Sequence, residues 1–421
     1  MSSQNRNSHD PYAPLRERDF RLLLAGMLFT NLTGQMVTFA IAWELWLRTD
    51  SAFALGLVGL VQVVPIILLA LPGGHVADQY NRKKVIAVTQ VLLAGCSLGL
   101  AMLSFLQGSL LLIYLCLLGI GISRAFNDPA VSTLLPATVP PSLFTTAATW
   151  WSSTSQIAAI AGPALAGLLA TFLQRLGPVY ALDAISALTF LVLVLLIRGR
   201  PLALAAKATT LESLREGLQF IRRERVILAA ITLDMFAVLL GGAVTLLPIY
   251  ATDILKVGPQ GLGLMRAAPS IGALLMALLL AHRPPLQRAG RSLLLAVTGF
   301  GVATIIFGLS RSFGLSIVML ILVGGLDNIS VVIRRSMILT RTPDELRGRI
   351  SAVNSIFISA SNELGGFESG LTAGLFGPII SVVGGGIGTL LVVISVAQAW
   401  PEMRRLRTVD GVENPGKGLR A

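Results

Sequence analysis

Long apolar runs recur along almost the whole chain, separated by short polar segments. Twelve of these runs approach or exceed about 20 residues, the length with which a helix crosses a bilayer. We place them at 20–47, 53–77, 85–106, 109–135, 144–173, 178–197, 226–252, 259–281, 292–310, 313–333, 350–376 and 378–400. The pattern predicts an all-α membrane protein with twelve transmembrane helices. The polar residues 1–19 contain no apolar segment, so no cleavable signal peptide is expected.

Composition agrees with this pattern and argues against a water-soluble enzyme. Of 421 residues, 54% are hydrophobic and 13% are charged, and the mean hydropathy is +0.76. Soluble domains carry about 25% charged residues, which they need to cover their surface. The two cysteines, Cys96 and Cys116, lie inside predicted spans, so a disulfide between loops is not expected.

The positions of the basic residues predict the orientation. The chain has 33 Lys and Arg against 21 Asp and Glu, a net charge of +12. An even number of spans puts both termini on one side, and 27 of the 33 basic residues fall on that side. Only Arg48, Arg175, Lys256 and Arg311 fall on the other. This asymmetry predicts cytoplasmic termini in a cell (inner or plasma) membrane, and it explains the net charge without nucleic acid.

One sizeable polar segment, 198–225, divides the spans into six and six. We therefore expect a cytoplasmic tail at 1–19, a first six-helix bundle at 20–197, a linker at 198–225, a second bundle at 226–400 and a tail at 401–421. Within the linker, apolar and charged residues alternate with the period of an amphipathic helix on the inner leaflet. Its role is either to join the two bundles or to regulate them.

The two halves align at an offset near 203 residues. The segment 139–143 falls on 342–346, and 162–167 falls on 365–370. Pro65 meets Pro269 one residue outside this register. A parallel repeat of six spans is the duplication expected of a transporter with a pseudo-two-fold axis along the membrane normal.

Two motifs resemble those of the major facilitator superfamily. After the second span, a Gly, an Asp and a basic cluster resemble its cytoplasmic signature, here formed by Gly74, Asp78, Arg82, Lys83 and Lys84. Gly74 is expected to allow close helix approach. Asp78 is a candidate conformational latch. The alternative is that it only helps to fix the membrane topology of the loop.

The second motif lies in the fifth span. There Gly162, Pro163 and Gly167 resemble the antiporter motif of the superfamily's exporters, although a simple helix kink is the alternative. The resemblance covers the whole chain. The segments 263–269, 327–334 and 361–370 resemble one branch of the superfamily, which contains enterobactin-exporter-like permeases and lies near the macrolide efflux proteins. The resemblance implies the major facilitator fold of two pseudo-symmetric six-helix bundles.

Charged residues inside a span are expensive and are functional candidates by default. Arg124 in the fourth span and Asp327 in the tenth occupy equivalent positions at the offset of 203. In the superfamily these spans line the central cavity, so we expect the two side chains to approach each other across the pseudo-two-fold axis. Asp327 would then bind a proton or a cationic substrate group in alternation with Arg124. The alternative is a static bridge, or pairing of Arg124 with Asp128 one turn along its own helix.

Further polar residues are candidates for the cavity. Glu363 lies near the middle of its span, where a carboxyl group is readily protonated, so it is a second candidate for coupling. Asp234 and Asn31 occupy matching places in the seventh and first spans and are expected to contact substrate, with Asn328 beside Asp327. Arg266 and Asp183 are expected to pair between helices.

These features predict a secondary active transporter, with proton-coupled export of a small siderophore-like molecule by alternating access as the leading hypothesis. A multidrug or macrolide efflux pump is the alternative, and an importer of the same fold is less favoured. A membrane enzyme is disfavoured because His9, His75 and His282 form no cluster with ligand spacing. The chain has no Walker-type phosphate-binding motif, and no cofactor or metal is implied. The expected partners are the substrate, protons and the lipid bilayer, and a monomer is expected.

Overall fold

The computed structural model describes residues 10–173, 175–198, 211–283 and 288–406. Its first half contains α1 (Ala13–Arg16), α2 (Arg18–Thr49), α3 (Ala52–Gln79), α4 (Arg82–Leu106), α5 (Leu110–Leu134), α6 (Phe144–Phe172) and α7 (Gly177–Leu196), with short 3-10 turns η1 (Leu135–Ala137) and η2 (Pro141–Leu143). The helix α8 (Leu211–Arg223) follows. The expected tails and linker fall partly on residues outside these ranges.

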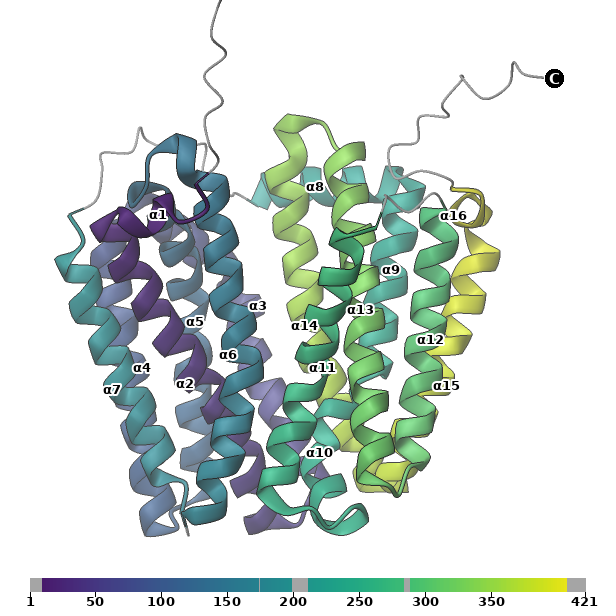
Figure 1. Ribbon diagram of the computed structural model, residues 1–421, viewed down its shortest axis with the longest axis horizontal. Helices are drawn as coiled ribbons and strands as arrows, with labels where there is room; N and C mark the ends of the chain where they lie inside the picture. The colour runs from purple at the N-terminus through teal and green to yellow at the C-terminus, as the bar shows by residue number, and fades with distance from the viewer. Residues whose placement is uncertain (1–9, 174, 199–210, 284–287, 407–421) are drawn as a thin grey trace, which may run out of the picture.

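The second half contains α9 (Arg225–Leu240), η3 (Ala243–Leu246), α10 (Leu247–Ile249), η4 (Tyr250–Ile254), α11 (Gly258–Ala281), α12 (Ala289–Leu309), α13 (Phe313–Arg341), α14 (Asp344–Phe376), α15 (Pro378–Ala399) and α16 (Pro401–Arg405). Among the described residues, eleven helices or helix groups are long and apolar enough to cross a membrane. The twelfth span is α14, a more polar helix of 33 residues that runs alongside the others (Figure 1). The predicted all-helical class is confirmed.

The seventh span is not one continuous helix. Its first part, α9, ends before Gly241 and Gly242, and the chain continues through η3, α10 and the π-turn η4. A side chain on Gly242 would lie 2.5 Å from the Gly365 carbonyl oxygen of α14. The glycine pair therefore lets the interrupted span pack closely against α14, and Pro248 follows where the helix restarts.

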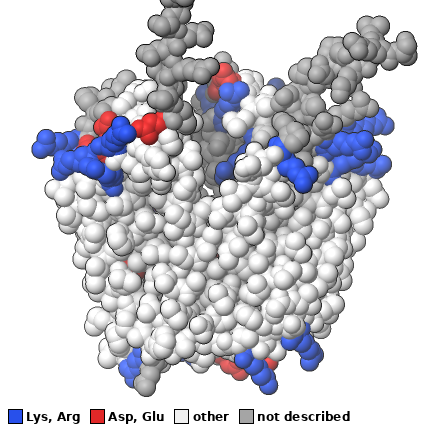
Figure 2. All heavy atoms as spheres, viewed as in Figure 1, with Lys and Arg blue, Asp and Glu red and all other residues white. Residues whose placement is uncertain are grey.

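The two ends of the helix bundle differ in charge. We call them the α8 end, which carries α1, α8 and α16, and the α10 end, opposite to it (Figure 1). Lys and Arg side chains gather at the α8 end, few lie at the α10 end, and the surface between is almost free of charge (Figure 2). An uncharged band between two charged rims is the surface expected of a protein that spans a bilayer.

The helix α8 lies across the α8 end of the second half rather than apart from it. Its Ile221 is fully buried in a cluster with Ile227, Ile338 and Ile350. Its Glu216 forms an ion pair with Arg349 of α14. The predicted amphipathic helix therefore packs its apolar face on protein.

Within the described residues, the apolar core that the two halves share lies at the α10 end. One cluster of buried residues there combines Phe39 and Trp43 of α2 with Tyr250, Leu262 and Phe307 of the second half. Toward the α8 end, each half has clusters of its own. Figure 2 shows the molecule hollowed between the halves at the α8 end.

Glycines bring the halves into backbone contact at the α10 end. On one side, α3 meets α14 where Gly56 packs on Gly370; a side chain on Gly370 would lie 2.5 Å from the Gly56 Cα. On the other side, α6 meets α11 where Gly167 packs on Gly263. One cross-half hydrogen bond, from Trp46 Nε1 to Thr252 Oγ1 at 2.8 Å, lies at the same end. The structure is thus closed at the α10 end and open at the α8 end.

A side chain at Gly370 should prevent this closure. Overpacking costs about 1–3 kcal/mol, so Gly370→Val should raise the fraction open at the α10 end about tenfold or more. A cysteine replacing Thr252, in a background free of native cysteine, should then react correspondingly faster with an impermeant maleimide. Gly374→Val, one turn along, is the control because its new side chain would meet Phe53 at an ordinary 3.8 Å. Equal labelling of the two folded variants would contradict the prediction.

Candidate functional site: two polar cavities related by the repeat

A polar cavity of about 340 Å³ lies within the first half. Side chains from α2, α4, α5, α6 and α7 line it: Thr30, Asn31, Gly34, Gln35, Val37, Thr38, Gln90, Leu93, Ile120, Ser123, Arg124, Asn127, Asp128, Ser155 and Asp183. Three of the predicted cavity residues, Asn31, Arg124 and Asp128, are therefore brought together. Most of the lining is polar, which is unusual inside an apolar bundle and indicates a site for a polar solute.

Arg124 is weakly held in this cavity. Its only protein hydrogen bond within the described residues is to Gln62 Oε1 of α3, at 3.4 Å. No ion pair joins Arg124 to Asp128 in that part of the chain, although the two are one helical turn apart. The field of Arg124 also reaches Asp183 of α7 and Glu363 of α14.

The remaining polar groups of the cavity are cross-linked between helices. Asn31 Nδ2 donates to Ser155 Oγ of α6 at 3.4 Å, and Ser97 Oγ donates to Asp183 Oδ2 at 2.7 Å. Asn127 Oδ1 accepts from Gln90 Nε2 at 3.0 Å and from Thr89 Oγ1 at 3.2 Å. These bonds fix the helices that surround Arg124. The expected pairing of Asp183 with a basic residue is replaced by this hydroxyl bond.

A second, much smaller cavity lies at the equivalent place in the other half. Eight residues line it: Asp234, Ala237, Val238, Val297, Phe300, Leu326, Asp327 and Ser330. Six of the eight lie 203 positions after a residue that lines the first cavity. Asp234 corresponds in this way to Asn31, and Asp327 to Arg124. The offset found in the sequence therefore relates the two cavities.

A buried ion pair dominates the second cavity. Arg334 of α13 binds Asp234 Oδ1 of α9, and the two side chains are only 2% and 8% exposed. Asp327 lies within electrostatic range of both. It precedes Arg334 by seven residues, two helical turns, so both lie on one face of α13. The centre thus contains two carboxyl groups and one guanidinium, of which the Asp234–Arg334 pair is buried.

The sequence analysis missed Arg334. The tenth apolar run was ended at residue 333, so Arg334 was counted among cytoplasmic loop residues, whereas α13 continues to Arg341. The sequence feature that points to Arg334 is its position seven residues after Asp327, which puts the two opposite charges on the same face of a helix. Arg334 Nε is buried without a hydrogen-bond partner among the described residues, which marks this guanidinium as incompletely satisfied.

Two expectations about this site are corrected. Arg124 and Asp327 form no ion pair within the described residues, because each lines a cavity enclosed by the helices of its own half. Asp234 is not a free cavity group, because Arg334 engages it.

Three other candidates, Glu363, Asn328 and Arg266, line neither cavity. Glu363 lies against Gly59 of α3, where the two halves meet. Asn328 has a buried Oδ1 without a partner within the described ranges. Arg266 is likewise enclosed, with Nε unpaired there, so its expected partner is not found.

The segment between α3 and α4 forms a tight turn at the α8 end. Asn81 caps α4 by accepting from Lys83 N at 3.0 Å, and Lys83 Nζ donates to the Ile197 carbonyl oxygen at the end of α7. A side chain on Gly74 would meet nothing, so the expected close approach is not at Gly74. It lies one residue earlier, where Gly73 packs on the Ala125 carbonyl of α5. The Asp78 side chain lies outside the described residues.

The glycines of the fifth-span motif make two contacts. Gly162 packs on Leu32 and Gln35 of α2, within the first half. Gly167 and the Pro163 carbonyl meet Gly263 of α11, across the halves. The helix α6 continues through Pro163 without a break. The motif therefore provides close backbone approach both inside and between the halves.

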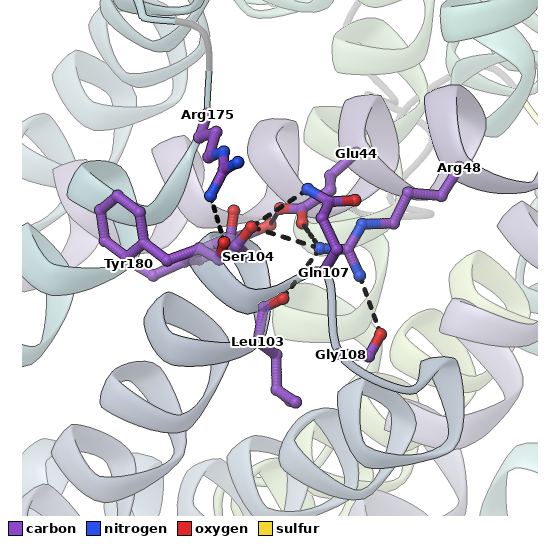
Figure 3. Close-up of polar contacts among 9 residues, drawn as sticks. Glu44, Arg48, Leu103, Ser104, Gln107, Gly108, Arg175 and Tyr180 are labelled. Atoms are coloured by element: carbon purple, nitrogen blue, oxygen red, sulfur yellow. Dashed lines mark hydrogen bonds and ion pairs between the residues drawn. The ribbon is translucent and has the colours of Figure 1, made fainter.

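A third polar cluster, at the α10 end of the first half, has a structural role (Figure 3). Arg48 forms an ion pair with Glu44 at 2.6 Å, and Tyr180 Oη donates to Glu44 Oε2 at 2.9 Å. Arg48 also donates to the carbonyl oxygens of Leu103 and Gly108, at 2.9 and 3.2 Å, which satisfies the end of α4. Predicted as a loop residue, Arg48 instead holds α2 to the turn between α4 and α5.

Comparison with known proteins identifies the class to which this fold and these cavities belong. A family model described as a transmembrane secretion effector matches residues 9–413. The chain belongs to this family of the major facilitator superfamily. It is a transporter-type membrane protein, and the predicted family and fold are confirmed.

Individual relatives cover nearly the whole chain. The enterobactin exporter EntS of Escherichia coli O1:K1 is 25% identical over 391 residues, covering 92% of this chain and 93% of the exporter. The EntS of Shigella boydii serotype 18 matches to the same extent.

Solved structures show the same fold at lower identity. An inward-facing, unoccupied bacterial homolog of the human lysosomal transporter Spinster has a TM-score of 0.73 at 15% identity, covering 96% of this chain and 99% of that one. A D-xylose-proton symporter has a TM-score of 0.71 at 13% identity, covering 92% and 98%.

Removal of Arg334 should destabilise the protein strongly. Breaking a buried ion pair costs about 3–5 kcal/mol because the partner is left charged without compensation. Arg334→Gln should therefore lower the thermal unfolding midpoint in detergent far more than Arg225→Gln. Arg225 pairs with Glu402 at 3.1 Å on the surface, where such a pair contributes at most about 1 kcal/mol. Similar shifts for the two variants would contradict the assignment of Arg334 to a buried, paired site.

Proposed function

We propose that this major facilitator protein is a proton-coupled exporter of a small organic molecule, working by alternating access. The observation that carries the proposal is the Asp234, Arg334 and Asp327 centre. Its two carboxyl groups line one small cavity, and the guanidinium forms a buried ion pair with Asp234. With both carboxyl groups ionised, the centre holds one uncompensated negative charge, which is costly in a low-dielectric interior.

Binding of one proton makes the centre neutral. Asp327 is the carboxyl group without an ion-pair partner among the described residues, so it is the proposed proton carrier. Glu363 remains a second candidate because it lies where the halves meet. A proton that binds from one side of the membrane and is released to the other would neutralise the centre and then restore its negative charge in each cycle.

Alternating access is supported by the way in which the halves meet. They touch through glycines and a shared core at the α10 end, while the cavity side is open at the α8 end. We assign the α8 end, with its basic side chains, to the cytoplasm of a cell (inner or plasma) membrane. The structure then represents the inward-facing state of a monomeric exporter.

Two motifs receive roles in the conformational change. Gly74, Asp78, Arg82, Lys83 and Lys84 are proposed to form the gating segment, which would engage the second half when the α8 end closes. The fifth-span motif is proposed to permit closure of the α10 end.

The proposed substrate is a siderophore-like metabolite, by analogy with the enterobactin exporter. The polar first cavity, with Arg124, Asn31 and Asp128, supports a hydrogen-bonding solute. Macrolide-type drug efflux is the alternative substrate class, and import is the alternative direction.

Asp327→Asn should abolish proton-driven transport. The amide keeps the size of the side chain but cannot carry the proton, so pH-driven accumulation of enterobactin in inside-out proteoliposomes should fall to background. A trapped pH dye should show no proton movement on addition of substrate. Asp50→Asn is the matched control, because Asp50 is exposed at the end of α2 and its left-handed conformation suits Asn.

Other outcomes separate the alternatives. Full pH-driven transport by Asp327→Asn would remove Asp327 from the coupling. Transport of erythromycin but not enterobactin would favour drug efflux, and accumulation only in right-side-out vesicles would favour import.

A further inference from the structure

The first cavity presents two opposite charges that form no ion pair with each other within the described residues. Arg124 and Asp128 lie one turn apart on the same face of α5, and both line the cavity. Charged residues at this spacing commonly pair. Here the two act on each other electrostatically without forming an ion pair within the described residues, and Asp128 is an exposed residue that lines the cavity.

The other carboxyl groups nearby feel the field of Arg124 but form no ion pair with it in the described part of the chain. Asp183 is 3% exposed and accepts a hydrogen bond from Ser97, so it is directed into the bundle. Glu363 belongs to α14 of the other half and forms no ion pair in the described part of the chain. Arg124 is left with its 3.4 Å bond to Gln62, so its guanidinium has donors available for a ligand.

The surroundings suit a solute that is polar along much of its length. Amide and hydroxyl groups face the cavity from α2, α4, α5 and α6, including those of Asn31, Gln35, Gln90 and Ser155. A volume of about 340 Å³ falls within the range of small-molecule sites. Gln90 Oε1 has no hydrogen-bond partner among the described residues, and Arg124 makes one bond there; a mainly apolar drug would leave these groups unsatisfied, at a cost for each.

We infer that the first cavity binds a dipolar solute, with an anionic oxygen on Arg124 and a cationic or hydrogen-bond-donating group on Asp128. This inference rests on the proposed function and names the substrate class for its cavity. Residues four apart in a helix are separated by about 6 Å along its axis. The ligand therefore carries its two opposite groups about one helical turn apart.

Three benzoyl compounds test both charges separately. N-benzoylglycine carries a carboxylate, N-benzoylethylenediamine carries an ammonium group, and Nα-benzoyllysine carries both. Titration calorimetry on the purified full-length protein should give Nα-benzoyllysine the tightest binding, at least about tenfold over either of the others.

Each cavity variant should remove the interaction with one of the two charged groups of the ligand. Arg124→Gln should weaken binding of the two carboxylate compounds about tenfold and leave the ammonium compound unchanged. Asp128→Asn should weaken the two ammonium compounds and leave N-benzoylglycine unchanged. Arg311→Gln and Asp50→Asn, which remove exposed charges at the α10 end, should change none of the three affinities.

Two results would overturn the inference: equal weakening of all three compounds by each cavity variant, or wild-type protein that fails to prefer Nα-benzoyllysine. The calorimetry measures no flux, so it is independent of the coupling proposal. If Asp327→Asn retains pH-driven transport while the binding pattern holds, the coupling proposal fails and the dipolar site stands.

Discussion

An ionisable side chain inside an apolar bundle must find its partner within the protein, because the membrane offers no water. The Asp234–Arg334 pair meets this requirement in the second half, where the cavity is too small to hydrate two charges. It joins α9 to α13 and leaves Asp327 beside it as the group whose charge is unbalanced. The first half meets the same requirement differently: Arg124 and Asp128 remain unpaired because they face an open, polar cavity.

The distribution of close contacts divides the molecule into parts that stay together and parts that can separate. Within each half, large buried side chains form clusters toward the α8 end. Between the halves, the closest contacts are between backbones at glycines, and the Trp46–Thr252 hydrogen bond joins them at the same end. Small residues allow close approach without interlocking side chains, so these surfaces can part more readily than the interior of a half.

The two halves place polar residues at equivalent positions of the repeat, but the residue types at these positions differ. Asn31 and Asp234 occupy equivalent places, as do Arg124 and Asp327, yet one cavity is large and polar and the other is small and lies beside an ion pair. The duplicated scaffold thus supplies two equivalent sites, and the two halves use them for different purposes in the function proposed above. A perfectly symmetric pair of sites would hold the same ligand twice and could not separate substrate from coupling ion.

The sequence by itself determined the twelve spans, the two halves and their offset, because apolar run length and repeat spacing are one-dimensional properties. It also identified Arg124, Asp128 and Asp327, since a charge in an apolar run is visible without structure. Only the tertiary structure decided which charges meet. Arg334 was assigned to a loop because the polar end of a helix buried by its neighbours looks like a loop in sequence. The separation of Arg124 from Asp327, the break after α9 and the packing of Gly73 in place of Gly74 likewise depend on helix rotation and on how the halves meet, which no single run of residues encodes.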